Sequence, residues 1–312
     1  MERFYTRKEV VVLLALLCVI LWGSAYPGVK TSYKLFGIGP SDTGSTTLLA
    51  GIRFSLAGIF TMAFLWVSNR RILLPGRRDL PAIGLTGLIQ TGGQYILFYI
   101  GVAHLTGVKS SILGATITFF SVILAHFMFR DDKLDGRKIA GCAAGFAGII
   151  IVNMGRGSLD SSFTMQGEGC MLLSAFAAAW GALISKKVSA SRNPVMVAGC
   201  QMLFGGIILT AAGLFMHGKV NSVSPGAMLL LIYLAGVSAV AFTLWTTLLK
   251  YNVSGKITIY NFLIPVFGSA LSALFLGEAI LTLQNLLALL LVCFGIAAVN
   301  YRGRFSELFN RL

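Results

Sequence analysis

Ten apolar runs alternate with short polar segments along the chain. Each run holds roughly 18 to 24 residues, the length that an α-helix needs to cross the hydrocarbon core of a bilayer. The separators contain glycine, proline or charged residues, which end helices. This pattern predicts an all-α integral membrane protein with ten transmembrane helices. The runs lie near residues 10–29, 46–67, 81–103, 108–129, 137–154, 166–185, 194–216, 226–249, 256–277 and 281–300.

The composition agrees with a chain that lies in lipid. Of the 312 residues, 56% are hydrophobic and only 12% are charged, and the mean hydropathy is +0.82. A soluble protein covers its surface with more charge than this. The first run follows Arg3, Arg7 and Lys8, as a secretory signal would. We interpret it as a retained first helix, because it has about 20 residues, lacks a small-residue cleavage pattern and precedes further runs of equal quality.

The distribution of basic residues predicts the orientation. Of the 25 lysines and arginines, 19 fall at one end of the predicted spans and five at the other, with Arg53 inside a span. Lysine and arginine near span ends are retained on the cytoplasmic side. We therefore expect both termini in the cytoplasm, as an even number of spans requires. A basic fringe facing anionic headgroups also accounts for the net charge of +14, so we expect no nucleic-acid partner.

The cysteines give no sign of a metal or disulfide framework. Each of the five lies in an apolar run, with no CxxC pair and no histidine at metal-binding spacing. We expect them to pack helix against helix, and we expect no metal and no cofactor. The five are Cys18, Cys142, Cys170, Cys200 and Cys293.

The second half of the chain repeats the first. The segment GIIIVN at 148–153 aligns with GIAAVN at 295–300, and the same shift of 147 residues aligns Lys109 with Lys256 and Asp131 with Glu278. We predict two repeats, 1–155 and 156–312. Because each holds five spans, an odd number, the second enters the membrane from the opposite side. Inverted repeats are typical of alternating-access carriers, and the alternative is a duplicated scaffold without transport activity.

Several local motifs carry a family resemblance. A Trp-Gly pair lies near the middle of the first and sixth spans, Arg53 and Phe54 occupy the second, and the acidic segments FRDD and FLGE close the fourth and ninth. With the five-plus-five repeat, the chain resembles the drug/metabolite transporter superfamily, specifically the EamA-type exporters of aromatic amino acids and metabolites. Thr118 departs from the pattern, since it stands where the second repeat has Pro265.

Polar and aromatic side chains at bilayer depth are the candidate substrate contacts. Aromatic rings, amides and hydroxyls without a buried acid suit a small amphipathic or zwitterionic solute. The alternative is that these residues form interface belts or pack between helices. The resemblance implies a cavity between spans one, three, four, six, eight and nine, which favours Trp22, Gln94, Trp180 and Tyr260. The full set is Trp22, Gln90, Gln94, Tyr95, Tyr99, Trp180, Trp245, Tyr260 and Asn261.

Four further positions are candidates for gating or charge. Pro265 cannot donate to the carbonyl of Asn261 and predicts a kink, either a hinge or a static bend. Lys109 and Lys256 open the fourth and ninth spans and are candidate gate residues. Arg53 is the one clear charge inside a span; we expect it to snorkel to the interface or bond helix-end carbonyls, and the alternative is an anion contact. No Asp or Glu lies mid-span, which favours exchange or uniport over a carboxylate relay.

These patterns exclude some functions and leave others open. The sequence has no GxSxG or HExxH motif, so we expect no membrane enzyme, and the loops are too short for a channel filter. We expect export of an amino acid or drug-like solute across a bacterial inner membrane, by a monomer or homodimer. The alternatives are uptake of a quaternary amine such as choline or of a nucleotide sugar, and a membrane receptor or scaffold that does not transport.

Overall fold

A computed structural model describes residues 2–70, 74–128, 134–153, 163–252, 257, 259–278 and 282–300. Within these ranges all regular structure is helical, which confirms the all-α prediction. Each predicted apolar run that the structure covers lies in a helical segment. The segments are α1 (Glu2–Tyr5), α2 (Lys8–Phe36), α3 (Thr43–Asn69), α4 (Leu80–Thr86), η1 (Gly87–Gly93), α5 (Gln94–His104), α6 (Gly107–Gly114), α7 (Ile117–Met128), α8 (Gly136–Asn153), η2 (Met165–Gly169), α9 (Cys170–Ser189), α10 (Pro194–Phe215), α11 (Pro225–Tyr251), η3 (Ile259–Phe262), α13 (Leu263–Leu276) and α14 (Leu283–Asn300).

Many of these helices can cross a membrane. In the described part of the chain, six helical stretches are both long and apolar enough to span a bilayer, and α13 and α14 are shorter apolar helices. The protein is therefore a membrane protein with several spans, while the count of ten stays a prediction. The six stretches are Lys8–Phe36, Thr43–Ser68, Gly107–Met128, Met165–Ser189, Pro194–Phe215 and Pro225–Tyr251.

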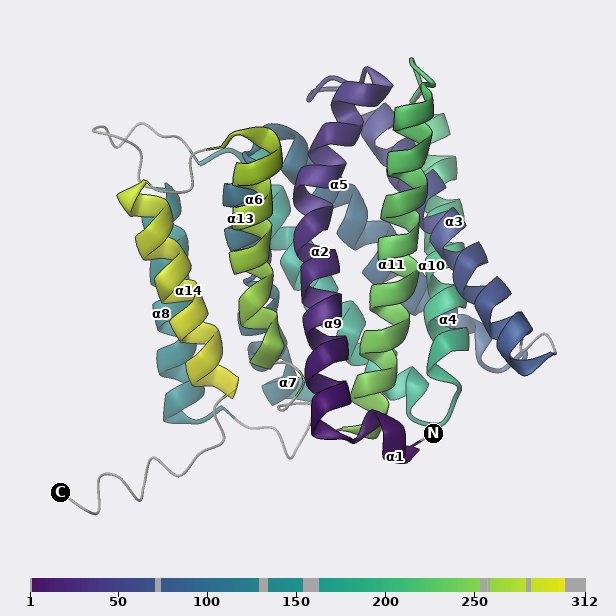
Figure 1. Cartoon of the computed structure of the whole chain (residues 1–312), viewed down its shortest axis with the longest axis horizontal. Helices are drawn as coiled ribbons and strands as arrows, with labels where there is room; N and C mark the ends of the chain where they lie inside the picture. Colours follow the sequence, from purple (N-terminus) through teal and green to yellow (C-terminus); the bar gives the residue numbers. More distant parts are fainter. Residues whose placement is uncertain are drawn as a thin grey trace.

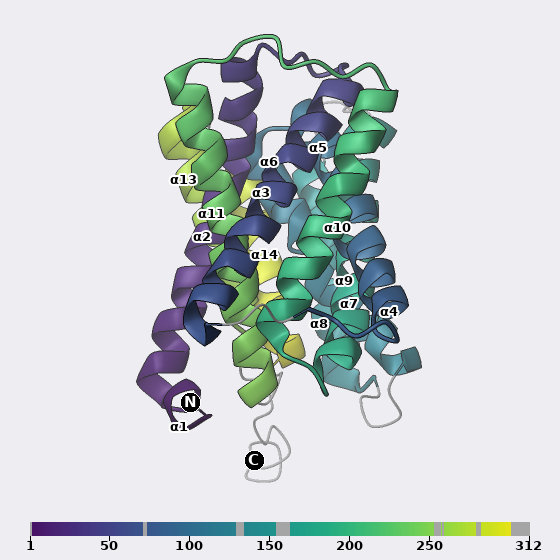
Figure 2. The ribbon, with the colours of Figure 1, turned by 90° about the vertical axis from the view of Figure 1, so that its right-hand side faces the viewer.

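The helices stand side by side as one bundle (Figures 1 and 2). The pair α8 and α14 packs at one edge and the pair α3 and α10 at the other, while α2 lies between α13 and α11 (Figure 1). We call the end that carries the N-terminus and Lys8 the proximal end. The opposite end, where α2 finishes at Phe36, is the distal end. Large apolar side chains such as Phe64, Phe215 and Leu290 are exposed on the sides, as expected of surfaces that face lipid.

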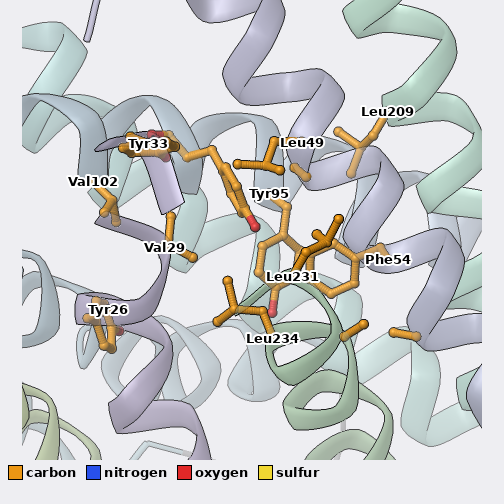
Figure 3. Packing of buried hydrophobic residues seen from close by; sticks show 14 of the residues in the cluster. Tyr26, Val29, Tyr33, Leu49, Phe54, Tyr95, Val102, Leu209, Leu231 and Leu234 are labelled. Atoms are coloured by element: carbon orange, nitrogen blue, oxygen red, sulfur yellow. The ribbon is translucent and has the colours of Figure 1, made fainter. Parts of the chain in front are cut away.

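Aromatic and aliphatic residues pack together in the centre of the bundle (Figure 3). Tyr26 and Tyr33 of α2 lie in the same buried cluster as Phe54 of α3 and Tyr95 of α5. The rings of Phe54 and Tyr95 have centroids only 4.0 Å apart. Because three helices contribute rings to one buried cluster, these contacts join α2, α3 and α5.

Glycines allow the edge helices to pack closely. A Cβ at Gly206 of α10 would overlap the backbone of Ser55 in α3, and one at Gly148 of α8 would lie 2.9 Å from the carbonyl oxygen of Ala288 in α14. Small residues let transmembrane backbones approach without a bulky side chain between them. The two edge pairs therefore depend on positions where no larger residue fits.

Several of the predicted spans are irregular inside, in the part of the chain that the structure describes; besides the π-helix η2 at the start of the sixth, three cases bear on the site. The segment 80–104 changes to a π-helix, η1, between α4 and α5, and the segment 107–128 breaks at Ala115 and Thr116 between α6 and α7. In the ninth predicted span the 3-10 helix η3 precedes α13. Pro265 lies in the first turn of α13, where its missing N–H costs no helical hydrogen bond. The irregularity expected near Asn261 is therefore a change of helix type that ends just before Pro265.

Candidate functional site

Arg53 of α3 is the most deeply buried charge among the described residues, with 2% of its surface exposed. Its guanidinium spans two other helices. Nε donates to the carbonyl oxygen of Leu234 at 3.1 Å and Nη2 to the hydroxyl of Ser238 at 2.9 Å, both on α11. Nη1 donates to the hydroxyl of Tyr99 on α5 at 3.1 Å. The five donors of arginine in a fixed fork suit such a three-way contact.

The prediction that Arg53 snorkels to the interface is wrong. Its partners are the hydroxyls of Tyr99 and Ser238 and the carbonyl oxygen of Leu234, which lies well inside α11. Its guanidinium carbon lies 5.0 Å from the centre of the Phe54 ring. Local sequence could not reveal this, because the partner helix lies about 180 residues further along the chain. Arg53 therefore ties α3, α5 and α11 together.

Tyr95 and Tyr99 of the candidate set belong to this packed centre. Both are buried, and Tyr99 has no exposed surface. The hydroxyl of Tyr33 donates to the carbonyl oxygen of Tyr99 at 2.7 Å, so the ring of Tyr99 and its backbone are both engaged. In this conformation the surfaces of both tyrosines are covered almost entirely by other residues of the protein.

Trp22, Trp245 and Tyr260 are linked by ring contacts and shared packing, with Trp22 at the middle of α2. The rings of Trp22 on α2 and Trp245 on α11 meet edge to face with centroids 5.0 Å apart. Trp245 and Tyr260 pack against the same small cluster, which includes Leu248. All three candidates are partly buried. They form one group within the candidate set, as Tyr95 and Tyr99 form another.

Asn261 lies next to Tyr260 in η3, and its side-chain oxygen Oδ1 is buried without a hydrogen-bond partner. Gln90 in η1 has the same property at Oε1, and it packs against Gly181 of α9. Unpaired buried oxygens cost about 1–3 kcal/mol each. These amides are therefore available to a water molecule or a solute group.

Gln94 and Trp180 belong to two other helices, α5 and α9. Gln94 begins α5 and is partly buried. Trp180 of α9 is 44% exposed and lines an open groove of about 500 Å³ together with apolar residues of η1, α5, α9 and α10. Because all residues of this groove are apolar, it offers no side-chain donor or acceptor to orient a zwitterion, apart from the indole N–H of Trp180.

The structure describes one of the two candidate gate lysines. Lys109 of α6 forms an ion pair with Glu168 of η2 at the distal end. Lys256 lies outside the described residues. A second distal ion pair joins Lys30 of α2 to Glu278, which follows α13, with 3.6 Å between Nζ and Oε1. Lys30 is one of the five basic residues at the less basic end of the predicted spans.

The proximal end has an ion pair of its own. Arg192, between α9 and α10, bonds the carboxylate of Asp79, which precedes α4. The guanidinium holds the pKa of Asp79 below its usual range. This pair joins two loops that are 113 residues apart in the sequence.

A bundle of apolar helices with buried polar groups, broken helices and paired charges at its ends defines a multi-pass membrane protein of the transporter class. The comparisons identify the family. A model of the EamA-like transporter family matches residues 10–154 and again 165–301, so the chain belongs to that family, within the drug/metabolite transporter superfamily. It is a transporter and not an enzyme.

Individual proteins are similar over nearly the whole chain. A probable amino-acid metabolite efflux pump of Escherichia coli (strain K12) is 28% identical, covering 92% of this chain and 93% of its own. The uncharacterized transporter YvbV of Bacillus subtilis (strain 168) is 24% identical, covering 96% and 94%. One solved crystal structure has a TM-score of 0.68 at 16% identity over 98% of this chain and 99% of its own, which shows a shared fold. With these bacterial relatives, the chain is a multi-pass inner membrane protein that carries a small-molecule substrate.

Proposed function

We propose that this protein exports a small amino-acid-like metabolite by alternating access, with two inverted five-helix repeats and both termini in the cytoplasm. The two family matches, of similar length, support the repeat. The similarity to a probable amino-acid metabolite efflux pump supports the class of solute and the direction. The excess of lysine and arginine at the proximal end supports the orientation.

The observation that carries the mechanism is a pair of helix breaks at equivalent positions. The break between Gly114 and Ile117 separates α6 from α7, and a shift of 147 residues takes it to Asn261 and Ile264, where η3 changes to α13. Thr118 stands where the second repeat has Pro265, yet both helices are interrupted at this depth. A helix interrupted near its middle can change the direction of one half relative to the other.

In the described part of the chain, the two interrupted helices pack against each other at the distal end. At the distal end α6 packs against α13, whereas α7 packs mainly against α9 and η3 packs against α14 and α2. This arrangement supports a state that is closed at the distal end, with the solute path leading toward the proximal end. With the proposed orientation, the structure corresponds to a carrier ready to receive a solute from the cytoplasm.

We place the solute between α2, α5, α11 and η3. Trp22, Trp245 and Tyr260 form an aromatic wall, and Gln94 and Asn261 supply amide groups; all five are partly buried, as expected of residues at the border of a path. Rings can stack on an apolar or cationic part of the solute, while amides orient its polar groups. Gln90, Tyr95, Tyr99 and Trp180 remain candidates for states in which the packing differs.

A ligand screen followed by flux tests this proposal. Purified protein is screened by thermal shift against amino acids, quaternary amines and nucleosides, and the best ligand is then used for flux in proteoliposomes. We expect an amino acid or a derivative to raise the Tm and to be transported. Trp22→Ala and Trp245→Ala should each weaken binding about tenfold, equivalent to about 1.4 kcal/mol, because one stacking contact is lost.

The fourth tryptophan supplies a matched control. Trp66 of α3 is 56% exposed and lies in a different part of the bundle, so Trp66→Ala should bind and transport as the wild type does. Unchanged binding in Trp22→Ala and Trp245→Ala would show that the site lies elsewhere. A response to quaternary amines alone would replace the amino-acid proposal with the choline-like one.

A further inference from the structure

Four charged side chains come together at the distal end of the bundle. Lys30 comes from α2, Lys109 from α6, Glu168 from η2, and Glu278 from the residues after α13. We call this set the distal latch. Lys30 pairs with Glu278 and Lys109 pairs with Glu168. Both lysines lie in the first family match and both carboxylates in the second, so each pair joins one half of the chain to the other.

Glu278 also caps a helix of the other half. Its Oε1 accepts the backbone N–H of Gly107 and its Oε2 accepts that of Val108, both at 2.9 Å. These groups begin α6, where backbone N–H groups have no helical partner and the helix dipole attracts an anion. Lys30 donates to the carbonyl oxygen of Leu105, just before α6. One carboxylate therefore holds α2, α6 and the end of α13 together.

Glu168 has the same double role on a smaller scale. Besides its pair with Lys109, its Oε2 accepts hydrogen bonds from the backbone N–H and the hydroxyl of Thr164, at 2.9 and 2.8 Å. The Glu168 side chain is only 4% exposed and that of Glu278 only 13%. Because these carboxylates are shielded from water, losing a partner costs more than at an open surface pair.

A tight seam lies beneath the latch. Ser111 of α6 and Ser269 of α13 have hydroxyl oxygens 3.0 Å apart, and a Cβ at Gly107 would lie 2.5 Å from the hydroxyl oxygen of Ser272. All three serines are fully buried. With the two helices this close, no solute can pass between them at the distal end.

We propose that Lys30, Lys109, Glu168 and Glu278 form an electrostatic latch that keeps the distal face closed, with Glu278 as its central residue, and that this latch opens in each transport cycle. The inference rests on the alternating-access part of the proposed function. In this proposal, the closed distal face is stabilised by the ion pairs between the two halves and by the hydrogen bonds of Glu278 to the N-terminus of α6.

Labelling of the seam tests the latch without any substrate. The five native cysteines are replaced, Ser272→Cys is introduced, and its reaction with a membrane-impermeant maleimide is timed in right-side-out and inverted vesicles, so that the result does not depend on the assumed orientation. In the parent protein we expect slow labelling from the distal side. Glu278→Gln should accelerate it about tenfold, since the ion pair is lost and the α6 cap is weakened.

Two further variants decide the interpretation. Lys30→Gln removes the same ion pair but leaves the carboxylate on α6, so we expect a smaller acceleration, about threefold. Asp79→Asn breaks an ion pair at the proximal end and should label from the distal side at the parent rate. If Glu278→Gln and Lys30→Gln both label from the distal side at the parent rate, the latch is overturned. If Glu278→Gln does not yield a monodisperse protein, the labelling rate of Lys30→Gln decides.

A cross-link tests whether the distal face must open. In the cysteine-free protein, Ser111→Cys combined with Ser269→Cys should form a disulfide under oxidant, lower flux at least tenfold and recover on reduction. Full flux in the cross-linked protein would overturn the opening step. If labelling behaves as expected while no amino acid is bound or moved, the latch stands and only the proposed substrate fails.

Discussion

At the scale of single residues, Arg53 is the most informative position. Polar groups inside a membrane helix must find partners within the protein, because lipid supplies none. Arg53 finds three neutral partners on α5 and α11. Its charge is therefore spread over a carbonyl dipole and two hydroxyls instead of being neutralised by a carboxylate. For the stability of the bundle, the fixed arrangement of the N–H donors on the guanidinium therefore matters more than the positive charge alone.

Arg53→Lys tests that view. Lysine keeps the charge but cannot reach partners in three directions, so we expect the free energy of unfolding to fall by about 2–4 kcal/mol, measured as a lower Tm in detergent. Arg77→Lys, in an exposed loop, is the matched control and should change stability by less than about 0.5 kcal/mol. Equal Tm values for the two variants would mean that the three contacts contribute little.

At the scale of helices, close approach decides which elements stay together. The pairs α3 with α10 and α8 with α14 are joined through glycines whose Cβ positions are already occupied by a neighbouring helix. Such pairs lack room to adjust, since backbone cannot move aside as the end of a flexible side chain can. We therefore expect each edge pair to behave as a rigid unit.

Gly206→Ala tests this packing. The added methyl would meet the backbone of Phe54 and Ser55, so α10 must move away from α3, and we expect a loss of about 1–3 kcal/mol, read as a lower Tm. Gly236→Ala in α11 is the control, because no atom lies within 4 Å of its Cβ position. The control should be neutral or stabilising by up to about 1 kcal/mol. A harmless Gly206→Ala would contradict the rigid pair.

The helices could be predicted from the sequence better than their interruptions. Apolar runs predict helices because a backbone in lipid must satisfy its own hydrogen bonds. No proline marks the break at Ala115 and Thr116, and the π-helix η1 packs against α9 and α10, which lie far along the chain. Likewise Lys30 pairs with Glu278 across almost the whole chain, which no local pattern reveals. The candidates Trp22, Trp245 and Tyr260 do lie near one another, as their polar-aromatic character suggested.

At the scale of the whole molecule, the repeat and the orientation belong together. The proposed five spans in each half require the second half to be inverted and both termini to share a side. In the proposed topology, the charged contacts between the halves at the distal end lie outside the cell, and the Asp79–Arg192 pair lies inside.

Reporter fusions test this topology. A fluorescent protein that folds only in the cytoplasm and a phosphatase that is active only in the periplasm are fused at each terminus and in the loop at residues 218–224, between α10 and α11. We expect fluorescence at both termini and phosphatase activity at the loop, as the positive-inside rule requires. A periplasmic C-terminus would require an odd number of spans and would remove the five-plus-five arrangement.

The serines between α6 and α13 have a consequence for the cost of opening. In the closed state the hydroxyl of Ser272 is buried without a partner, a penalty of about 1–3 kcal/mol. The hydroxyl of Ser111 bonds both the carbonyl oxygen of Val108 and the hydroxyl of Ser269. When the helices separate, water hydrates all three groups. In the proposed opening, the serines of the seam gain hydration while the latch loses its ion pairs. These two effects offset each other, so the closed and open states can differ little in free energy. Binding of a small solute can then shift the balance between the two states.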